Sequence, residues 1–260
     1  MKVKPTSSAC VAILAAAASA ITLAGCRGAE AEASERVRTP SAPATQYIVA
    51  VDISASRSES QLREAQELVR GLVARIGYGD RFVLLETYRA ANDSAAQWQD
   101  SVPAPRDPSR PRAGERKRLE RFQLVAGAVV PTFFDPKRQP HVLTTDLFQT
   151  LGRVADYAHS SGGRRTVVLL LSDMLQSTNE VNMERAGGVP GAAWIAARKR
   201  DGRLPALGGT CVYVAGADVG SARGVRVREF WREYFEAAGA ELSPAGYRNM
   251  LSDPGELRCD

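Results

Sequence analysis

The chain has 260 residues, with 34 Lys and Arg residues against 29 Asp and Glu residues, and a formal net charge of +5. The basic residues are interleaved with acidic ones along most of the chain. This charge pattern gives no support for a nucleic-acid-binding protein.

The first 25 residues have the parts of a secretory signal. Lys2 and Lys4 give a positive start, residues 11–23 form an uncharged Ala-rich run, and small residues follow. The run is too short for a comfortable membrane span. Its removal takes away two lysines and no acids, which lowers the formal net charge from +5 to +3. We expect an exported protein, with an uncleaved membrane anchor or an ordinary secreted protein as the alternatives.

Residues 23–26, Leu-Ala-Gly-Cys, resemble the lipobox of bacterial lipoproteins. The resemblance implies cleavage before Cys26, a lipid on its thiol and acylation of the new N-terminus, which together hold a protein on a membrane. The rest of residues 26–45 has no apolar period and is interpreted as a flexible tether. Arg27 replaces the Asp that retains some lipoproteins at the inner membrane. We therefore favour the periplasmic face of the outer membrane, with the cell surface as the alternative.

Residues 46–260 are expected to form one α/β domain. Residues 46–51 are almost wholly apolar, which is typical of a strand buried on both faces of a sheet. An amphipathic helix follows, with Ser58 and Gln61 as a capping box. Residues 81–88 form a second strand, so the segment is a βαβ unit.

Residues 89–141 interrupt this pattern and are interpreted as an insertion. Residues 103–114 are rich in Pro and Arg and indicate an exposed loop, and residues 115–130 are expected to be helical. The basic residues of this helix most simply form a solvated face. A docking patch for an acidic partner or for lipid head groups is the alternative.

The β and α units then continue towards the C-terminus. Thr144-Thr145-Asp146 begins a helix, and residues 166–171 form the most apolar run after the signal. We expect this run to be a central strand that neighbours residues 46–51. The remaining elements are a helix, a strand, a helix and a possible edge strand, at residues 190–200, 210–215, 227–238 and the final segment. The predicted fold is a Rossmann-like, open, mainly parallel sheet with helices on both faces.

Two cysteines remain once Cys10 has left with the signal and Cys26 carries lipid. These are Cys211, in an expected strand, and Cys259, near the C-terminus. Disulfides persist in exported proteins, so we favour a bond that ties the tail to the strand. Two unpaired thiols are the alternative.

Five oxygen-bearing side chains follow strand ends or begin a helix, and they are Asp52, Ser54, Ser56, Thr145 and Asp173. In such sheets, ligands bind beyond the carboxyl ends of the strands. Hydroxyl and carboxylate oxygens are suited to Mg²⁺ or Mn²⁺. Helix capping explains each residue taken singly. The five together predict a site for one divalent cation.

The same residues resemble the metal-ion-dependent adhesion site of the von Willebrand factor A domain. The matching stretches are Asp-Ile-Ser-Ala-Ser at residues 52–56, Thr145 in Thr-Asp-Leu, and Asp173 in Leu-Leu-Leu-Ser-Asp-Met. Residues 79–83, Gly-Asp-Arg-Phe-Val, are similar to the start of the family's second strand. The resemblance covers about residues 46–216.

This resemblance implies how the site is used. Ser54, Ser56 and Thr145 are expected to bind the cation through hydroxyl oxygens, with Asp52 and Asp173 acting through water and by orienting the hydroxyls. One position is left open for an acidic side chain of a partner, since a cation that its own site does not neutralise attracts an external carboxylate.

Two features depart from the family pattern. Met174 stands where the family usually has Gly, which is expected to alter the loop. The approach to Thr145 is also longer than usual, so Thr144 is an alternative ligand, and the insertion could cover the site.

We therefore expect a lipid-anchored, extracytoplasmic binding module, not an enzyme, that engages an Asp or Glu of a protein partner through Mg²⁺ or Mn²⁺. The alternatives are a metal-free scaffold and, less favoured, a metal-dependent hydrolase such as a phosphatase. Ser54 stands where a phosphatase would carry a second Asp, and the sequence has no GxSxG, HExxH or P-loop motif. Nothing places His141 or His159 near a nucleophile.

Overall fold

The computed structural model describes residues 43–54, 56–87, 96–135 and 144–259. The predicted signal, Cys26, most of the tether and His141 lie outside these residues. The chain divides after Val37, and everything described below belongs to the unit Arg38–Asp260. None of the helices within the described ranges combines the length and the apolar character that crossing a membrane requires.

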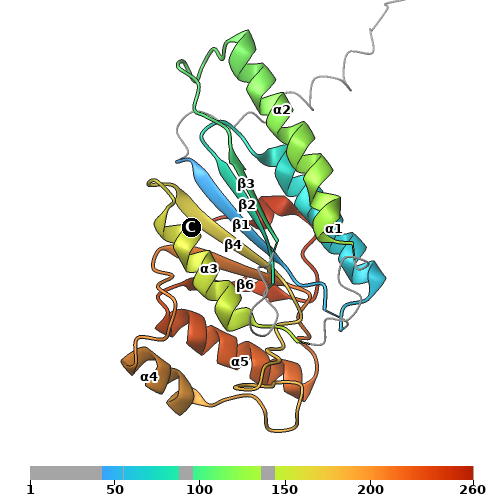
Figure 1. The fold of residues 1–260 in the computed structure, drawn as a ribbon, viewed down its shortest axis with the longest axis vertical. Helices are drawn as coiled ribbons and strands as arrows, with labels where there is room; N and C mark the ends of the chain where they lie inside the picture. Colours follow the sequence, from blue (N-terminus) through green and yellow to red (C-terminus); the bar gives the residue numbers. More distant parts are fainter. Residues whose placement is uncertain (1–42, 55, 88–95, 136–143, 260) are drawn as a thin grey trace, which may run out of the picture. The chain divides into compact units, whose positions relative to one another are not determined.

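Six strands form one mixed, mostly parallel sheet in the order β3-β2-β1-β4-β5-β6 (Figure 1). The strands are β1 (Thr45–Val51), β2 (Arg81–Glu86), β3 (Gln97–Ser101), β4 (Arg165–Leu171), β5 (Thr210–Ala215) and β6 (Glu241–Arg248). Only β3 pairs in the antiparallel direction. The α/β prediction is confirmed, and so is the central place of β4 beside β1.

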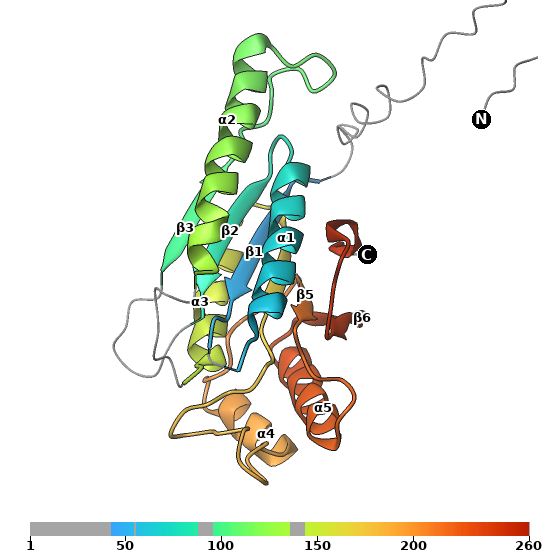
Figure 2. The same ribbon diagram turned by 90° about the vertical axis from the view of Figure 1, so that its right-hand side faces the viewer.

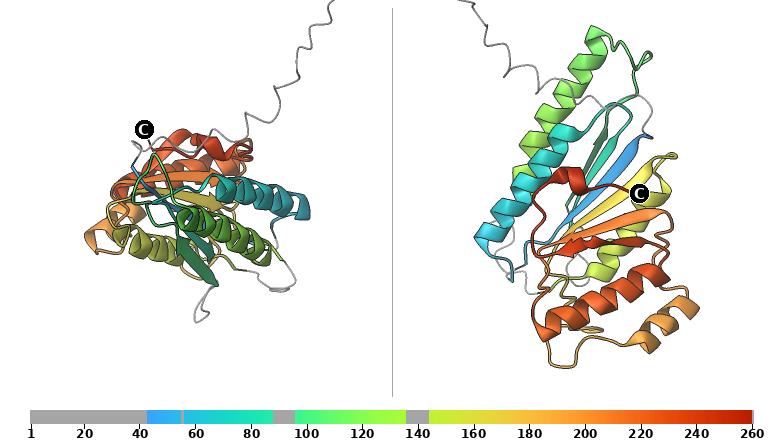
Figure 3. Two further views of the ribbon diagram at one scale, coloured as in Figure 1. Left: turned by 90° about the horizontal axis from the view of Figure 1, so that it is seen from above. Right: turned by 180° about the vertical axis from the view of Figure 1, so that it is seen from behind.

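Helices cover both faces of this sheet. One face carries α1 (Glu59–Arg75), α2 (Ala113–Val129) and the short 3-10 helix η1 (Val130–Phe133). The other face carries α3 (Leu147–His159), α4 (Ala192–Arg200) and α5 (Ala222–Ala237). Figure 2 shows α1 and α2 in front of the first strands, and the right-hand view of Figure 3 shows the same two helices from behind.

The central strands are apolar on both sides because they face two cores. In β1, Val49 belongs to the core under α1, whereas Ile48 and Ala50 belong to the core under α3 and α5. Successive strand residues point to opposite faces, so a buried strand needs apolar residues at every position. The predicted capping box is also confirmed, since Ser58 Oγ accepts from Gln61 N at 3.2 Å and Ser58 N donates to Gln61 Oε1 at 2.9 Å.

Three elements of residues 89–141 are described, and they are β3, α2 and η1. Helix α2 lies close to its predicted range, but β3 was not anticipated. Its residues are mainly polar and exposed, as befits an edge strand with one face in solvent. Trp98 alone reaches inwards, with ring centroids 6.1 Å from Phe82 and 6.2 Å from Phe122.

The C-terminal segment folds back over the sheet and α1. The 3-10 helix η3 (Pro254–Glu256) contacts α1 at Gly71, where a Cβ atom would lie 2.9 Å from Pro254 Cγ. Glycine inside a helix costs stability, and here it allows this close approach. At the end of the segment, Cys259 and Cys211 are joined by a disulfide with sulfurs 2.02 Å apart.

We predict that the disulfide stabilises the domain substantially, because it closes a loop with a sequence separation of 48 residues. The double variant Cys211→Ala/Cys259→Ala should lose about 2–4 kcal/mol of unfolding free energy. Urea denaturation of the oxidised protein and the variant measures this loss. Reduced wild-type protein is the matched control and should resemble the variant. Equal stability of oxidised wild type and variant would contradict the prediction.

Candidate functional site

The parallel pairing of β1 with β4 brings two aspartates together. Val51 lies opposite Leu171, and Asp52 N donates to Leu171 O at 3.0 Å. Asp52 and Ser172 therefore leave the sheet from neighbouring positions, and Asp173 follows one residue later. This is the carboxyl edge of the strands, where ligands bind in open α/β sheets.

Both oxygens of the Asp52 carboxylate are held by hydrogen bonds. Oδ1 accepts from Ser54 N at 2.9 Å, and Oδ2 accepts from Ser172 Oγ at 2.7 Å. The residue is only 2% exposed. The sequence prediction missed Ser172 as the residue that orients Asp52. Its position directly after the most apolar strand was the available signal.

Ser54 and Ser56 connect Asp52 to Asp173. The two serine Oγ atoms lie 2.9 Å apart, and the Ser56 hydroxyl hydrogen-bonds to the Asp173 side chain. Asp173 Oδ1 also accepts from Leu175 N at 3.0 Å. Four of the five predicted residues therefore form one continuous polar network.

Thr145 contacts the loop that follows Asp173 through its backbone carbonyl. It is buried, and its carbonyl accepts from Ser177 N at 2.9 Å, in the loop that follows Asp173. The side chain of Gln176 in that loop binds Leu147 N at 2.7 Å. In the described part of the chain, no hydrogen bond links the Thr145 hydroxyl to the other four residues. The structure therefore brings Thr145 to the same loop without joining its side chain to the network.

Burial and the charge of Asp52 both disfavour the ionised form of Asp173. Burial raises the pKa of Asp173, and the nearby charge of Asp52 raises it further. Hydrogen bonds from Ser56 and Leu175 N and the positive charge of Arg57 act in the opposite direction. The balance is a raised pKa, as expected for an acid in a site with more negative than positive charge.

Arg57 is a second residue that the sequence prediction missed. It is 8% exposed, and burial lowers the pKa of its guanidinium, whereas Asp52 and Asp173 raise it. Its Nε and Nη1 atoms are buried without a hydrogen-bond partner among the described residues. A Cβ atom at Gly216 would lie 1.8 Å from Nη1, so the guanidinium occupies space that only this glycine leaves.

The oxygen atoms of this network fit a hard divalent cation. Neighbouring ligands of an octahedral Mg²⁺ at 2.0–2.1 Å are about 2.9 Å apart, and the Ser54 and Ser56 Oγ atoms have a separation of 2.9 Å. The same distance suits the hydrogen bond that joins them here. The described ranges contain no group of three or more His, Cys, Asp or Glu side chains arranged for a metal. A cation would therefore depend on hydroxyl oxygens as well as on Asp52 and Asp173.

Met174 forms the turn at a position where the von Willebrand factor A domain, which the sequence resembles, usually has Gly. Its φ is +65°, a left-handed conformation that glycine adopts freely and other residues seldom do. Its side chain is fully buried, its N–H donates to Ser172 Oγ at 3.0 Å, and its carbonyl accepts from Trp231 Nε1 at 2.8 Å. These contacts hold the turn without a glycine.

An alanine variant is usually more stable than a glycine variant at the same position, and we expect the opposite order of stability at Met174. Both variants lose a buried side chain, which costs about 2–5 kcal/mol. Met174→Ala should be the less stable of the two by about 1 kcal/mol, because alanine keeps the left-handed strain and glycine relieves it. Urea denaturation of the three proteins tests this order. Equal or greater stability of the Ala variant would argue against a left-handed residue 174.

The raised pKa of Asp173 predicts how the metal-free protein responds to pH. The folded protein holds the Asp173 proton more tightly than the unfolded chain, in which the Asp173 side chain has the ordinary pKa of 3.8. Stability is therefore lost as pH rises through the folded-state pKa. With a chelator present, Asp173→Asn should be more stable than wild type at neutral pH, and the difference should shrink below the ordinary Asp value. A difference that is constant with pH would disprove the coupling.

Comparisons with known proteins give distant likenesses. No family model and no curated protein matches the sequence. One similar solved structure is a von Willebrand factor type A protein from Catenulispora acidiphila, at 10% identity and a TM-score of 0.38, covering 83% of this chain and 40% of that one. Another is proximal thread matrix protein 1 from the mussel byssus, at 14% identity and a TM-score of 0.39, covering 83% and 45%.

A third is the pilus adhesin SpaC from Lactobacillus rhamnosus GG, at 13% identity and a TM-score of 0.47, covering 84% of this chain and 29% of that one. The chain thus spans less than half the length of each of these three structures. The α/β assignment rests on the strand order and pairing described above.

Proposed function

We propose that this domain is a binding module that holds one Mg²⁺ or Mn²⁺ and engages a protein partner through an Asp or Glu carboxylate. The observation that carries the proposal is the network of Asp52, Ser54, Ser56 and Asp173 at the carboxyl edge of the sheet. Burial and then the charge of Asp52 raise the pKa of Asp173, and a divalent cation would relieve the repulsion between the two acids.

The residues would divide the work by their chemistry. Ser54, Ser56 and Thr145 would offer hydroxyl oxygens to the cation, which when bound provides an electrophilic position for an external carboxylate. Ser172 holds the Asp52 carboxylate in place with a bond of 2.7 Å, and Leu175 N holds that of Asp173 with a bond of 3.0 Å. Such preset side chains lower the ordering cost of binding.

Arg57 sets the net charge of the proposed cation site. Two aspartates and one buried arginine leave the cluster with one negative charge, so a divalent cation would leave it with one positive charge. That residual charge favours an acidic side chain from a partner over a neutral one. Without Arg57 the same cation would be fully neutralised by the two aspartates.

The proposal includes the cell envelope as the place of action. The lipobox-like residues 23–26 support lipid attachment at Cys26, and the following residues, up to 45, support a flexible tether between membrane and domain. We favour the periplasmic face of the outer membrane, with the cell surface as the alternative. A tethered module of this kind samples partners within reach of its membrane.

A thermal-shift titration with Mg²⁺ or Mn²⁺ tests the cation site. At about 100 times the Kd, the cation should stabilise the wild type by about 2.7 kcal/mol, which corresponds to roughly 5–10 °C in Tm for a domain of this size. Asp52→Ala and Thr145→Ala should abolish or greatly reduce the shift. Asp107→Asn, an exposed loop residue outside the network, is the control and should keep it.

Each other result selects an alternative. If the cation does not raise the Tm of the wild type, the remaining interpretation is the metal-free scaffold. An equal shift in Asp52→Ala would place the cation elsewhere. A shift accompanied by turnover of a phosphoester panel would favour the hydrolase.

A further inference from the structure

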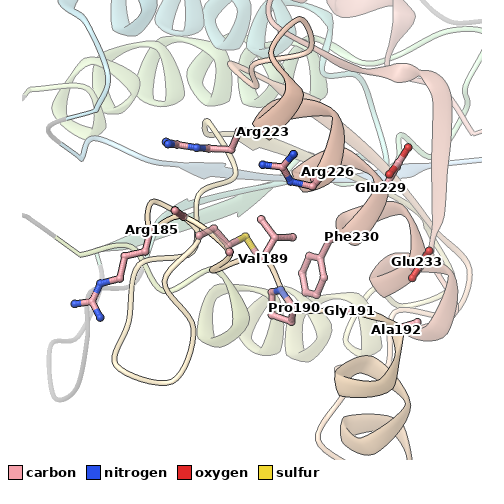
Figure 4. Close-up of a pocket in the computed structure, with 13 residues that line it drawn as sticks. Arg185, Val189, Pro190, Gly191, Ala192, Arg223, Arg226, Glu229, Phe230 and Glu233 are labelled. Carbon is pink, nitrogen blue, oxygen red and sulfur yellow. The ribbon is translucent and has the colours of Figure 1, made fainter.

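A cavity of about 520 Å³ lies between α5 and the long loop that leads from β4 to α4 (Figure 4). Met183 and Phe230 form part of its lining and are themselves buried, and Val189 and Pro190 add apolar surface. The volume falls in the range of small-molecule sites. The cavity shares none of its lining residues with the candidate cation site.

The loop side of the cavity is tightly built. Met183 N donates to Gln176 O at 2.8 Å, and Gly188 N donates to Arg185 O at 3.0 Å. A Cβ atom at Gly188 would lie 1.8 Å from Asn182 O, so this close turn requires glycine. The cavity therefore has a preformed wall.

Charged side chains of opposite sign stand at separate parts of the cavity. Figure 4 shows Arg223 and Arg226 near each other, Glu229 and Glu233 further along α5, Phe230 beside Val189 and Pro190, and Arg185 extending away from them. At 1.5 Å per residue, the centres of the two pairs are about 10 Å apart along the helix.

These four charges are not committed to salt bridges within the described residues. Hydrogen bonds from Ser221 and Gly220 lower the pKa of the exposed Asp218 carboxyl, and the charge of Arg223 lowers it further without a salt bridge between Arg223 and Asp218. Arg223 and Arg226 are exposed, as is Glu229, and Glu233 is half-buried. All four are available to a ligand.

One of these charges also opposes the helix dipole. Arg223 lies in the first turn of α5, and that turn holds no acidic residue. Acids stabilise the N-terminal end of a helix, so an arginine there is locally unfavourable. A ligand that places an anionic group near Arg223 offsets this cost. Local conflicts of this kind are expected at functional sites.

We propose that this cavity binds a short extended peptide, with a carboxylate at Arg223 and Arg226 and an ammonium group at Glu229 and Glu233. Three extended residues span about 10 Å, which matches the separation of the two charged pairs. Phe230, Val189 and Pro190 give the same cavity an apolar surface, which suits an apolar central side chain. The carboxylate binds best to paired arginines, which offer several donors in a fixed geometry. This proposal does not depend on the cation site.

Isothermal titration calorimetry with the tripeptide Ala-Leu-Ala tests the proposal, in chelator so that the cation site does not contribute. The peptide with both termini free should bind, and either C-terminal amidation or N-terminal acetylation should weaken binding about tenfold or more, because each removes one charged group from a paired site. Binding of the blocked peptides as tightly as the free one would overturn the proposal, as would no binding of the free peptide at several millimolar.

Charge variants on α5 locate the binding. Arg223→Gln/Arg226→Gln should lose the preference for a free carboxylate, and Glu229→Gln/Glu233→Gln should lose the preference for a free amine. Arg232→Gln/Glu236→Gln changes two exposed residues of the same helix outside the cavity and should bind like wild type. Circular dichroism confirms that each variant is folded. Unchanged preferences in both cavity variants would place the peptide elsewhere and overturn the proposal.

Discussion

Parallel pairing between β1 and β4 is the constraint from which the arrangement of the candidate site follows. The pairing sets Val51 opposite Leu171, and so starts the loops of Asp52 and Asp173 side by side. A shift of one residue would turn each β1 side chain to the other face. Val49 and Ile48 face different cores, so such a shift would disturb the packing of both. The two hydrophobic layers thus fix the positions of acids that lie beyond the ends of the strands.

The polar network at this edge lowers the stability of the fold, and the packing of the rest of the domain must offset this loss. The network includes the buried acid Asp52, the half-buried acid Asp173, a left-handed Met174, and the buried guanidinium of Arg57, two of whose nitrogens have no hydrogen-bond partner among the described residues. Each departs from what favours stability alone. Sites that bind charged ligands commonly accept such costs.

The sequence predicted the elements whose signal is local. Apolar runs identified the four central strands, and Ser58 with Gln61 identified the start of α1. β3 was missed because its residues are polar and its contribution depends on Trp98 reaching Phe82 and Phe122 from another part of the chain. Sequence patterns predict an element poorly when the residues it packs against are distant in the sequence.

The same limit applies to the site residues. Asp52 and Asp173 could be placed together because the ends of neighbouring strands meet, but Arg57 is buried only because Gly216, on a different strand end, leaves room for it. The cavity beside α5 likewise requires a loop and a helix that are more than 30 residues apart in sequence to lie side by side. These features become visible only when the whole sheet is assembled.

The hydrogen bond from Trp231 Nε1 to the carbonyl of Met174 connects α5 directly to the loop of Asp173. Movement of the helix would be transmitted to a residue whose backbone is already in an unfavourable region, and adjustment of that residue would be transmitted back to the helix. Coupling between two binding sites is reciprocal in free energy. Any coupling between a cation beside Asp173 and a ligand on α5 would therefore change the two dissociation constants by the same factor, with the indole ring of Trp231 as the connecting part.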